Sequence, residues 1–297
     1  MFFNRKSVYR SPKENTKLGN FEKLEARNMM ASVIGDFNGD GFNDLASGIP
    51  HEDLGARRDA GAVLVRYGNG YGLNGRTELW NAGHVAGLDI REGDQFGAAL
   101  IAGDFNGDGI DDLAVGIPNR DLGGITDAGA VGVIYGMPAG IFAGGLSPWR
   151  TDVFFQGMEG LQDQPDALDR FGTSLSAGDF NGDGCDELVV GVPSESFSEP
   201  KLPEVITRQD VGAVHIIQGN ATGLTTQDSQ FWTPGRDSVR RNGERYNRFG
   251  SAFAVGDFDG SGRDDLAIGA PGDSFNAQPN AGAVHVIYSS VDGLARD

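Results

Sequence analysis

Short segments in which bulky residues alternate with small ones recur along this chain. In residues 113–117 (LAVGI), leucine, valine and isoleucine occupy every second position; residues 45–49 (LASGI) and 266–270 (LAIGA) follow a similar pattern. Alternate residues of a β-strand point to the same face of its sheet. The pattern therefore predicts strands with one bulky face and one small face, which suit sheets that are stacked closely.

These segments belong to a longer repeat with four copies. The copies begin at Gly35, Gly103, Gly178 and Gly256 and read GDFNGDGFNDLASGIP, GDFNGDGIDDLAVGIP, GDFNGDGCDELVVGVP and GDFDGSGRDDLAIGAP. Self-similarity of this kind is the signature of a protein built from stacked equivalent units. We therefore expect residues 31–297 to form one repeat domain.

Each unit carries signals for up to four strands. A Phe-Gly pair opens the first strand in three units, the alternating segment is the second, and a Gly-Ala-Val segment begins the third. A fourth apolar run appears in three units, at residues 78–80, 153–156 and 230–233. Radial repetition of four-stranded sheets makes a β-propeller. The predicted fold is all-β, a β-propeller built of four-stranded antiparallel blades.

The number of blades leaves two arrangements open. The first unit has Asn28-Met29 in place of Phe-Gly, and the fourth unit ends near Leu294 without a fourth strand. Either residues 1–30 supply that strand and close a small ring, or the four units form a partial arc completed by another chain or by further sequence. A partial arc would expose sheet faces and edges and would favour self-association.

The loop ahead of each alternating segment carries oxygen-bearing side chains at regular positions. Counted from its first aspartate, the second loop has Asp104, Asn106, Asp108 and Asp112 at positions 1, 3, 5 and 9, with Gly109 at position 6. Hard oxygen ligands at this spacing, with a glycine that permits a sharp turn, suit Ca²⁺. An EF-hand would also need a glutamate at position 12, where these loops have already entered an apolar strand. A calcium loop between two strands is therefore predicted.

The full set of predicted ligands includes the main-chain carbonyl at position 7. The ligands are Asp36, Asn38, Asp40, Phe42 and Asp44 in the first loop; Asp104, Asn106, Asp108, Ile110 and Asp112 in the second; Asp179, Asn181, Asp183, Cys185 and Glu187 in the third; and Asp257, Asp259, Ser261, Arg263 and Asp265 in the fourth. The longer Glu187 and the uncharged Ser261 predict weaker binding in the last two loops. Ordinary Asp-Asn-Gly hairpin turns are the alternative. Four copies of one oxygen spacing favour up to four structural Ca²⁺ ions.

The succession of Phe-Gly, the calcium loop, Gly-x-Pro and Gly-Ala-Val resembles the FG-GAP repeat. That repeat forms the integrin α-subunit propeller and also occurs in phosphatidylinositol-glycan-specific phospholipase D and in bacterial surface proteins. The resemblance covers residues 31–294 of this chain. It implies a calcium-bearing propeller that mediates adhesion or ligand binding and has no catalytic centre of its own. The family's propellers have more blades than the four copies found here.

The charge balance argues against nucleic acids and anionic membranes as partners. Asp and Glu number 42 against 24 Lys and Arg, which gives a formal net charge of −18. Nucleic acids and anionic membranes need a basic surface, so neither is expected as a partner. The single cysteine, Cys185, excludes an intrachain disulfide.

Residues 1–30 differ in kind from the remainder of the chain. They are rich in Lys and Arg, and we expect a disordered leader or sorting segment there. Residues 21–32 resemble the short Leu-Glu-x-Arg tags found near the start of large bacterial surface proteins, although a secretory apolar stretch is lacking. No apolar run is long enough for a transmembrane segment. The resemblance of residues 21–32 to these tags leads us to expect an extracellular or cell-surface location.

Strand connectivity separates the calcium loops from the predicted recognition surface. Connections between strands one and two lie at the opposite end of a sheet from those between strands two and three, so the long variable loops face away from the calcium loops. We expect an unidentified protein or glycan ligand at that end. The basic connector, residues 236–248, offers Arg236, Arg240, Arg241, Arg245, Tyr246 and Arg248 for an anionic group. The alternative is that these arginines pair with neighbouring acids such as Asp237 and Glu244.

No catalytic motif is apparent, which favours a non-enzymatic binding module. Two other interpretations stay open: a scaffold domain of a secreted hydrolase or lyase, and a fragment of a larger adhesin. His215 and His285 occupy equivalent repeat positions and are expected to be packing or surface residues. The loop phenylalanines are expected in the core between sheets, at Phe37, Phe105, Phe180 and Phe258.

Overall fold

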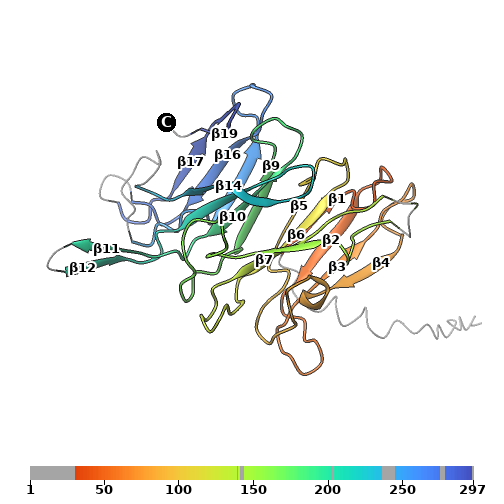
Figure 1. Cartoon of the computed structure of the whole chain (residues 1–297), viewed down its shortest axis with the longest axis horizontal. Helices are drawn as coiled ribbons and strands as arrows, with labels where there is room; N and C mark the ends of the chain where they lie inside the picture. The colour runs from red at the N-terminus through yellow and green to blue at the C-terminus, as the bar shows by residue number, and fades with distance from the viewer. Residues whose placement is uncertain are drawn as a thin grey trace, which may run out of the picture.

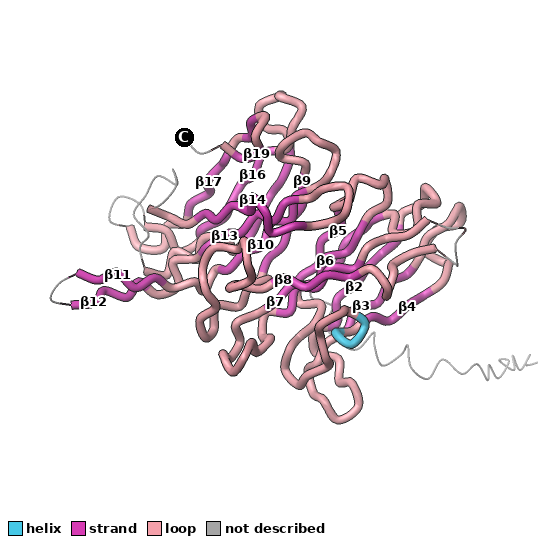
Figure 2. The backbone as a smooth tube through the Cα atoms, in the orientation of Figure 1, coloured by secondary structure: helices cyan, strands magenta, loops and turns pink. Residues whose placement is uncertain are grey.

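The computed structural model describes residues 31–138, 140, 144–201, 204–235, 245–274 and 278–295, and the regular secondary structure in this part of the chain is almost entirely β-strand. Figure 2 shows strands and loops throughout, with one short 3-10 turn, η1 (Ala82–His84). The predicted leader and the predicted ligand residues Arg236, Arg240 and Arg241 lie outside the described residues. Among the described residues, no helix has both the length and the apolar character needed to cross a membrane.

The strands form four main sheets, one for each repeat. The first sheet contains β1 (Ser32–Gly35), β2 (Asp44–Ile49), β3 (Ala62–Arg66) and β4 (Thr77–Trp80); the second contains β5 (Ala99–Gly103), β6 (Asp112–Ile117), β7 (Ala130–Ile134) and β8 (Thr151–Phe154); the third contains β9 (Ser174–Gly178), β10 (Glu187–Val192), β13 (Ala213–Gln218) and β14 (Thr225–Trp232); and the fourth contains β15 (Ala252–Gly256), β16 (Asp265–Ala270) and β17 (Ala283–Ile287). Neighbouring strands are antiparallel throughout. The predicted blade architecture is confirmed, and the fourth sheet has three strands in the described part of the chain.

Two small hairpins accompany the main sheets. β11 (Phe197–Lys201) pairs with β12 (Glu204–Arg208), and β18 (Ser289–Ser290) pairs with β19 (Gly293–Leu294) directly after the fourth sheet. The sequence pattern indicated only a long variable loop at residues 194–210. Its second half reads EVITR, and the β-branched residues there favour an extended backbone.

The sheets are stacked in a row that does not close into a ring. Figure 1 shows the first sheet at one end of the row and the fourth at the other. The first strands of successive sheets contact one another, β1 with β5, β5 with β9, and β9 with β15, and no comparable contact joins β15 back to β1 among the described residues. The small closed ring is therefore wrong, and the partial arc is confirmed. Alanine and glycine on one face of each sheet allow successive sheets to approach closely.

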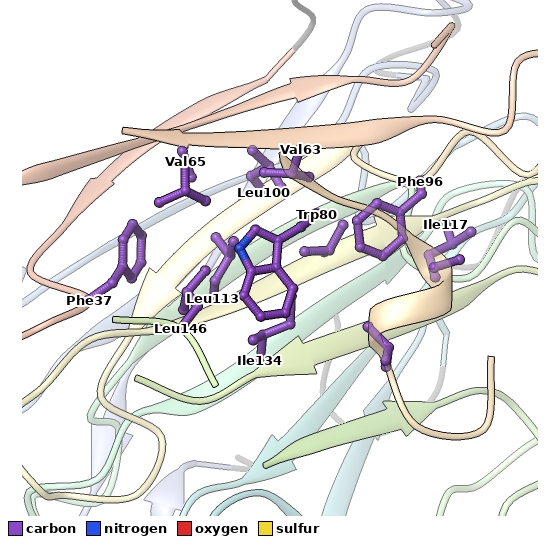
Figure 3. Close-up of a cluster of buried hydrophobic side chains, with 14 of the residues drawn as sticks. Phe37, Val63, Val65, Trp80, Phe96, Leu100, Leu113, Ile117, Ile134 and Leu146 are labelled. Atoms are coloured by element: carbon purple, nitrogen blue, oxygen red, sulfur yellow. The ribbon is translucent and has the colours of Figure 1, made fainter. Parts of the chain in front are cut away.

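Packing between sheets follows the predicted bulky and small faces. We call the face of a sheet toward the preceding sheet its leading face, and the face toward the following sheet its trailing face. The bulky residues Leu113, Val115 and Ile117 lie on the leading face of the second sheet and pack with Val63 and Val65 of the first. Figure 3 shows this cluster together with Trp80 and Phe96. Equivalent clusters lie between the second and third sheets and between the third and fourth.

The Phe-Gly pairs do not begin the first strands, which corrects the sequence prediction. The strands begin three residues later, at Ala99, Ser174 and Ala252. Gly97 has φ +92 and cannot continue an extended strand. Each phenylalanine instead forms an isolated bridge with the glycine of the preceding sheet's Gly-Ala-Val segment, in the pairs Gly61 with Phe96, Gly129 with Phe171, and Gly212 with Phe249.

One of the four loop phenylalanines is not in the core. Phe37, Phe105 and Phe180 are buried as predicted, whereas Phe258 of the fourth loop is 49% exposed. The first three are covered by the sheet that follows their own, and no sheet follows the fourth in the described part of the chain. His215 is completely buried against Phe171 and Phe231, which confirms it as a packing residue.

Candidate metal centres and the variable-loop end

Each candidate calcium loop is shaped by main-chain hydrogen bonds to its first aspartate. In the second loop, Asp104 Oδ1 accepts from the N–H of Asp108 at 3.1 Å and Oδ2 accepts from the N–H of Gly109 at 2.7 Å. The corresponding pair of hydrogen bonds is present in the other three loops. Gly107 and Gly109, at positions 4 and 6, both have positive φ, and so do their equivalents in every loop. Only the second of these two glycines was predicted from the sequence to permit the turn.

The carboxylate at position 9 closes the loop from a buried site. Asp112 is fully buried; its Oδ2 accepts from Phe105 N–H at 3.1 Å and its Oδ1 from Gly136 N–H at 2.8 Å. Burial, with added repulsion from carboxylates of the same loop, raises the pKa of Asp44 to about 6 and the pKa values of Asp112 and Glu187 to about 8. A divalent cation among these carboxylates would favour their ionised forms. Binding of a cation would therefore be coupled to loss of protons from these buried carboxyl groups.

The fourth loop shows the convergence of oxygens most directly. Asp257, Asp259 and Asp265 each offer a carboxylate oxygen, and these atoms lie within 4.8 Å of one another. This loop carries Asp259 where the other loops have asparagine at position 3. Three hard oxygen donors in one small space fit a Ca²⁺ ion. The predicted carbonyl ligands at position 7 and the predicted weaker affinity of loops three and four stay predictions.

The structure adds a role for the acidic residue at position 8, which the sequence analysis did not assign. Asp111 Oδ2 accepts from the N–H of Asp36 in the preceding loop at 2.7 Å, and its own N–H donates to the Asp36 carbonyl at 3.2 Å. The same two hydrogen bonds join Asp186 to Asp104 and Asp264 to Asp179. We call this contact the position-8 clasp. The sequence signal for this contact was the aspartate found at position 8 in three of the four copies. The clasp links each candidate metal loop to the next.

The variable loops gather at the end of the strands opposite the calcium loops, as predicted. We call this side of the stacked sheets the variable-loop end and the opposite side the calcium-loop end. The connector ahead of the second sheet hydrogen bonds to the variable loop of the first, from Gln95 N–H to the Asp59 carbonyl at 3.1 Å. At the next two junctions the main-chain N–H of Arg170 donates to the Asp127 carbonyl at 3.1 Å, and the main-chain N–H of Arg248 donates to the Asp210 carbonyl at 2.9 Å. Each connector is therefore fixed to the loop of the sheet before it.

Three of the six predicted ligand-binding residues lie in the described part of the chain. Arg245, Tyr246 and Arg248 have exposed side chains at the variable-loop end. Tyr246 is fixed to Gln209, because its N–H donates to the Gln209 carbonyl at 2.8 Å and its hydroxyl donates to Oε1 at 3.0 Å. The structure thus holds this short basic segment in place beside the variable loop of the third sheet.

At one set of equivalent positions at this end, three sheets have an acidic residue and one has an arginine, and all but the first of these residues are buried. The third residue after the second strand is Glu52, Arg120, Glu195 or Asp273, and in all four the N–H donates to the last residue of that strand and the carbonyl accepts from the Gly-Ala-Val glycine. Arg120 is only 3% exposed, and its Nη1 donates to Asp94 Oδ2 at 2.5 Å and to the Asp89 carbonyl at 2.8 Å. Its other terminal nitrogen contacts the Asp89 carboxylate. The second sheet thus has a buried ion pair.

The third sheet has a carboxyl group at this position. Glu195 is 1% exposed, accepts from Gln156 Nε2 at 2.7 Å and accepts from Ser196 N–H at 3.0 Å. Burial, followed by the charges of Asp169 and Asp163, raises the pKa of Glu195 to about 9. Burial also raises the pKa of Asp169, the equivalent of Asp94, to about 7. Sequence reasoning missed these residues, although aligning the four copies would have shown the change from Arg120 to Glu195.

Comparison with known proteins agrees with the repeat geometry. The FG-GAP repeat family model matches residues 30–65, 96–134, 171–217 and 249–287, which together exceed half of the chain. Integrin alpha pat-2 of Caenorhabditis briggsae is 28% identical over 285 residues, covering 90% of this chain and 20% of that protein. Integrin alpha-PS2 of Drosophila melanogaster is 32% identical over 248 residues, covering 80% and 15%. Phosphatidylinositol-glycan-specific phospholipase D of Mus musculus is 36% identical over 124 residues, covering 42% and 14%.

The chain thus spans a fifth or less of the length of these relatives. Among solved structures, the exotype rhamnogalacturonan lyase YesX aligns with a TM-score of 0.47 and 16% identity, covering 80% of this chain and 38% of that chain.

Proposed function

Since this chain belongs to the FG-GAP repeat family, we propose that it is a calcium-stabilised propeller segment that acts outside the cell or on its surface. It binds a protein or glycan ligand and contributes to adhesion without catalysing a reaction. Four copies of one loop geometry, each built around a first aspartate held by two main-chain N–H groups, carry this proposal.

The proposed role of calcium is structural. The loops join the first and second strands of each sheet, and the position-8 clasp connects each loop to its neighbour. A bound cation would offset the repulsion among the carboxylates of one loop, such as Asp104, Asp108 and Asp112. The sheets would then keep the spacing that their packed faces require.

The proposed ligand surface is the variable-loop end. Adhesion is the role implied by the resemblance to integrin α propellers, and the loops at this end differ in length and sequence from sheet to sheet. Arg245 and Arg248 present exposed guanidinium groups beside Tyr246, which suits a carboxylate or sulfate of an acidic glycan or protein.

Equilibrium dialysis against Ca²⁺ tests the metal part of the proposal. We expect up to four bound ions per chain, and Asp104→Ala is expected to remove one of them, because Asp104 organises its loop. Glu92→Ala is the matched control, since Glu92 is an exposed acid in a connector at the variable-loop end. Absence of bound Ca²⁺ at millimolar supply would contradict the proposal.

A binding screen tests the ligand part. The probes are an array of acidic and neutral glycans and purified surface proteins, each measured in calcium and in chelator. We expect Arg245→Ser combined with Arg248→Ser to weaken binding of the probe that is captured, and Arg91→Ser, on the connector of the second sheet, to leave it unchanged. Turnover of a glycan or phospholipid in the same assays would instead support the scaffold of a secreted hydrolase or lyase.

A further inference from the structure

The trailing face of the fourth sheet is apolar and exposed, although the same face is buried in every other sheet. On the third strand of the first three sheets, the trailing-face residues Val63, Val65, Val131, Val133, Val214 and Ile216 are at most 1% exposed, because the following sheet covers them. The equivalents in the fourth sheet are Val284, which is 69% exposed, and Val286, which is 44% exposed. This face has the composition of an interface between sheets.

The leading face of the first sheet is exposed in a complementary way. Ile34 is 63% exposed and Leu79 is 44% exposed. In the later sheets the position of Ile34 is occupied by residues that lie directly against a glycine of the preceding sheet, in the pairs Ala102 with Gly35, Ala177 with Gly103, and Val255 with Gly178. The equivalent glycine of the fourth sheet is Gly256, and only the ring of Phe258 lies near the position of its missing Cβ.

The position-8 clasp has one unused half at each end of the row. Asn43 occupies position 8 in the first loop and is exposed, and the main chain of Asp257 in the fourth loop is the equivalent of the clasped Asp36, Asp104 and Asp179. An asparagine Oδ1 accepts a main-chain N–H as a carboxylate does. It also adds no negative charge beside Asp257, Asp259 and Asp265, which already lie close together.

A second contact between sheets is also incomplete at both ends. The hydroxyl of Tyr67 accepts from Leu146 N–H of the next sheet at 3.0 Å, and the hydroxyl of Tyr135 accepts from Leu224 N–H at 2.8 Å. Each leucine follows a glycine in the loop after the third strand. The equivalent tyrosine of the fourth sheet, Tyr288, is 51% exposed, and the equivalent leucine of the first sheet, Leu73, is 41% exposed.

We propose that the trailing face of the fourth sheet docks on the leading face of the first sheet of a second copy of this chain. The contact continues the sheet-to-sheet interface found three times within the chain, with Ile34 against Gly256 and Asn43 on the main chain of Asp257. Leu73 on Tyr288 would repeat the leucine-to-tyrosine contact made at the first two junctions; the third sheet has Gln218 in place of the tyrosine. A second copy is the favoured occupant because one chain carries both halves of every contact. Two copies supply eight sheets if each contributes its four, within the range of about 4–8 blades typical of propellers. A pair that makes both contacts closes into a ring.

Sedimentation equilibrium of the whole chain in calcium tests the pairing. We expect the mass of two chains at micromolar concentration for the wild type. Ile34→Glu and Val284→Glu are each expected to give the mass of one chain, because each places a carboxylate in the apolar contact. Trp149→Glu is the control: Trp149 is 87% exposed in a loop of the second sheet and should leave the pair intact. Unchanged circular dichroism in each variant shows that it is folded.

Mixing the two single-chain variants separates this contact from any other kind of dimer. Ile34→Glu keeps an intact trailing face and Val284→Glu keeps an intact leading face, so an equimolar mixture should form a two-chain species through one contact. This mixed pair should dissociate at a higher protein concentration than the wild-type pair, because the wild-type pair has two contacts. A mixture that stays at the mass of one chain, or a wild type that is single at all concentrations, would overturn the proposal. Wild-type polymers that the mixture reduces to pairs would support the contact and refute the closed ring.

Discussion

The calcium-loop end and the variable-loop end of the stacked sheets both repeat their main-chain hydrogen bonds, but they differ in whether the side chains repeat. At the calcium-loop end, the first aspartate of every loop accepts the same pair of main-chain hydrogen bonds. At the variable-loop end the main-chain bonds also repeat, yet the residues at the equivalent positions are Glu52, Arg120, Glu195 and Asp273. The repeat therefore maintains the first aspartate at the calcium-loop end, whereas an acidic residue is exchanged for an arginine at the other. We interpret the first end as shared support and the second as the region where function is specialised.

The largest effect should come from removing calcium, which acts on all four loops together. A ligand that binds only the folded state stabilises it by about 2.7 kcal/mol per site at 100 times its dissociation constant. We therefore expect a chelator to lower the melting temperature markedly, and added Ca²⁺ to restore it. Differential scanning calorimetry in EDTA and in millimolar Ca²⁺ measures the change. An identical melting curve in EDTA and in Ca²⁺ would show that calcium does not stabilise the fold and would contradict the interpretation of the calcium-loop end as shared support.

Breaking the buried ion pair at the variable-loop end should have the next largest effect. Arg120→Ala leaves Asp94, which is 2% exposed, without its guanidinium partner. Loss of one partner from a buried pair typically costs about 3–5 kcal/mol. Chemical denaturation in calcium measures the free energy of unfolding. Arg91→Ala is the control, because Arg91 also contacts Asp89 but is exposed, and its loss should cost less than about 1 kcal/mol.

The carboxyl group at the equivalent position of the third sheet predicts a pH dependence. The pKa of Glu195 is raised from 4.5 to about 9, so the folded state holds its proton more tightly than the unfolded chain. The contribution of Glu195 to stability is therefore complete below pH 4.5 and is lost as pH rises toward 9.

The variant Glu195→Gln isolates this contribution. We expect it to be more stable than the wild type by roughly 1–3 kcal/mol at pH 8 and similar to it near pH 4.5. Denaturation of both proteins across this range, in calcium, measures the difference. A difference that does not change with pH would show that Glu195 ionises in the folded state as it does in the unfolded chain.

The smallest effect should come from the position-8 clasp, which belongs to the calcium-loop end. Asp111→Ala removes the acceptor of the Asp36 N–H, and loss of one partly buried hydrogen bond of this kind costs about 0.5–1.5 kcal/mol. Asn43→Ala is the matched change at the same loop position of the first sheet, where the structure shows no preceding sheet among the described residues. It should leave the unfolding free energy of the single chain unchanged. Equal effects of the two variants would show that the clasp does not contribute to sheet stacking.

Sequence alone identified the second strand of each sheet and the loop that precedes it. The alternation in residues 113–117 identified the strand and its two faces, and the oxygen spacing from Asp104 to Asp112 identified the loop. These features are local, because strand periodicity and loop geometry depend on neighbouring residues in the chain. The order of strands in each sheet followed as well, since strands that are consecutive in the chain are usually neighbours in a sheet.

The tertiary structure decided what each repeated position touches. Asp111 reaches the main chain of a different repeat. Arg120 and Glu195 share a backbone position, yet one pairs with carboxylates and the other accepts a hydrogen bond from Gln156. Val131 and Val284 have the same place in the pattern, yet one is buried and the other is exposed because only the first has a sheet stacked on it. Burial and charge pairing depend on which module lies next in space. The sequence of a single repeat carries no record of that neighbour.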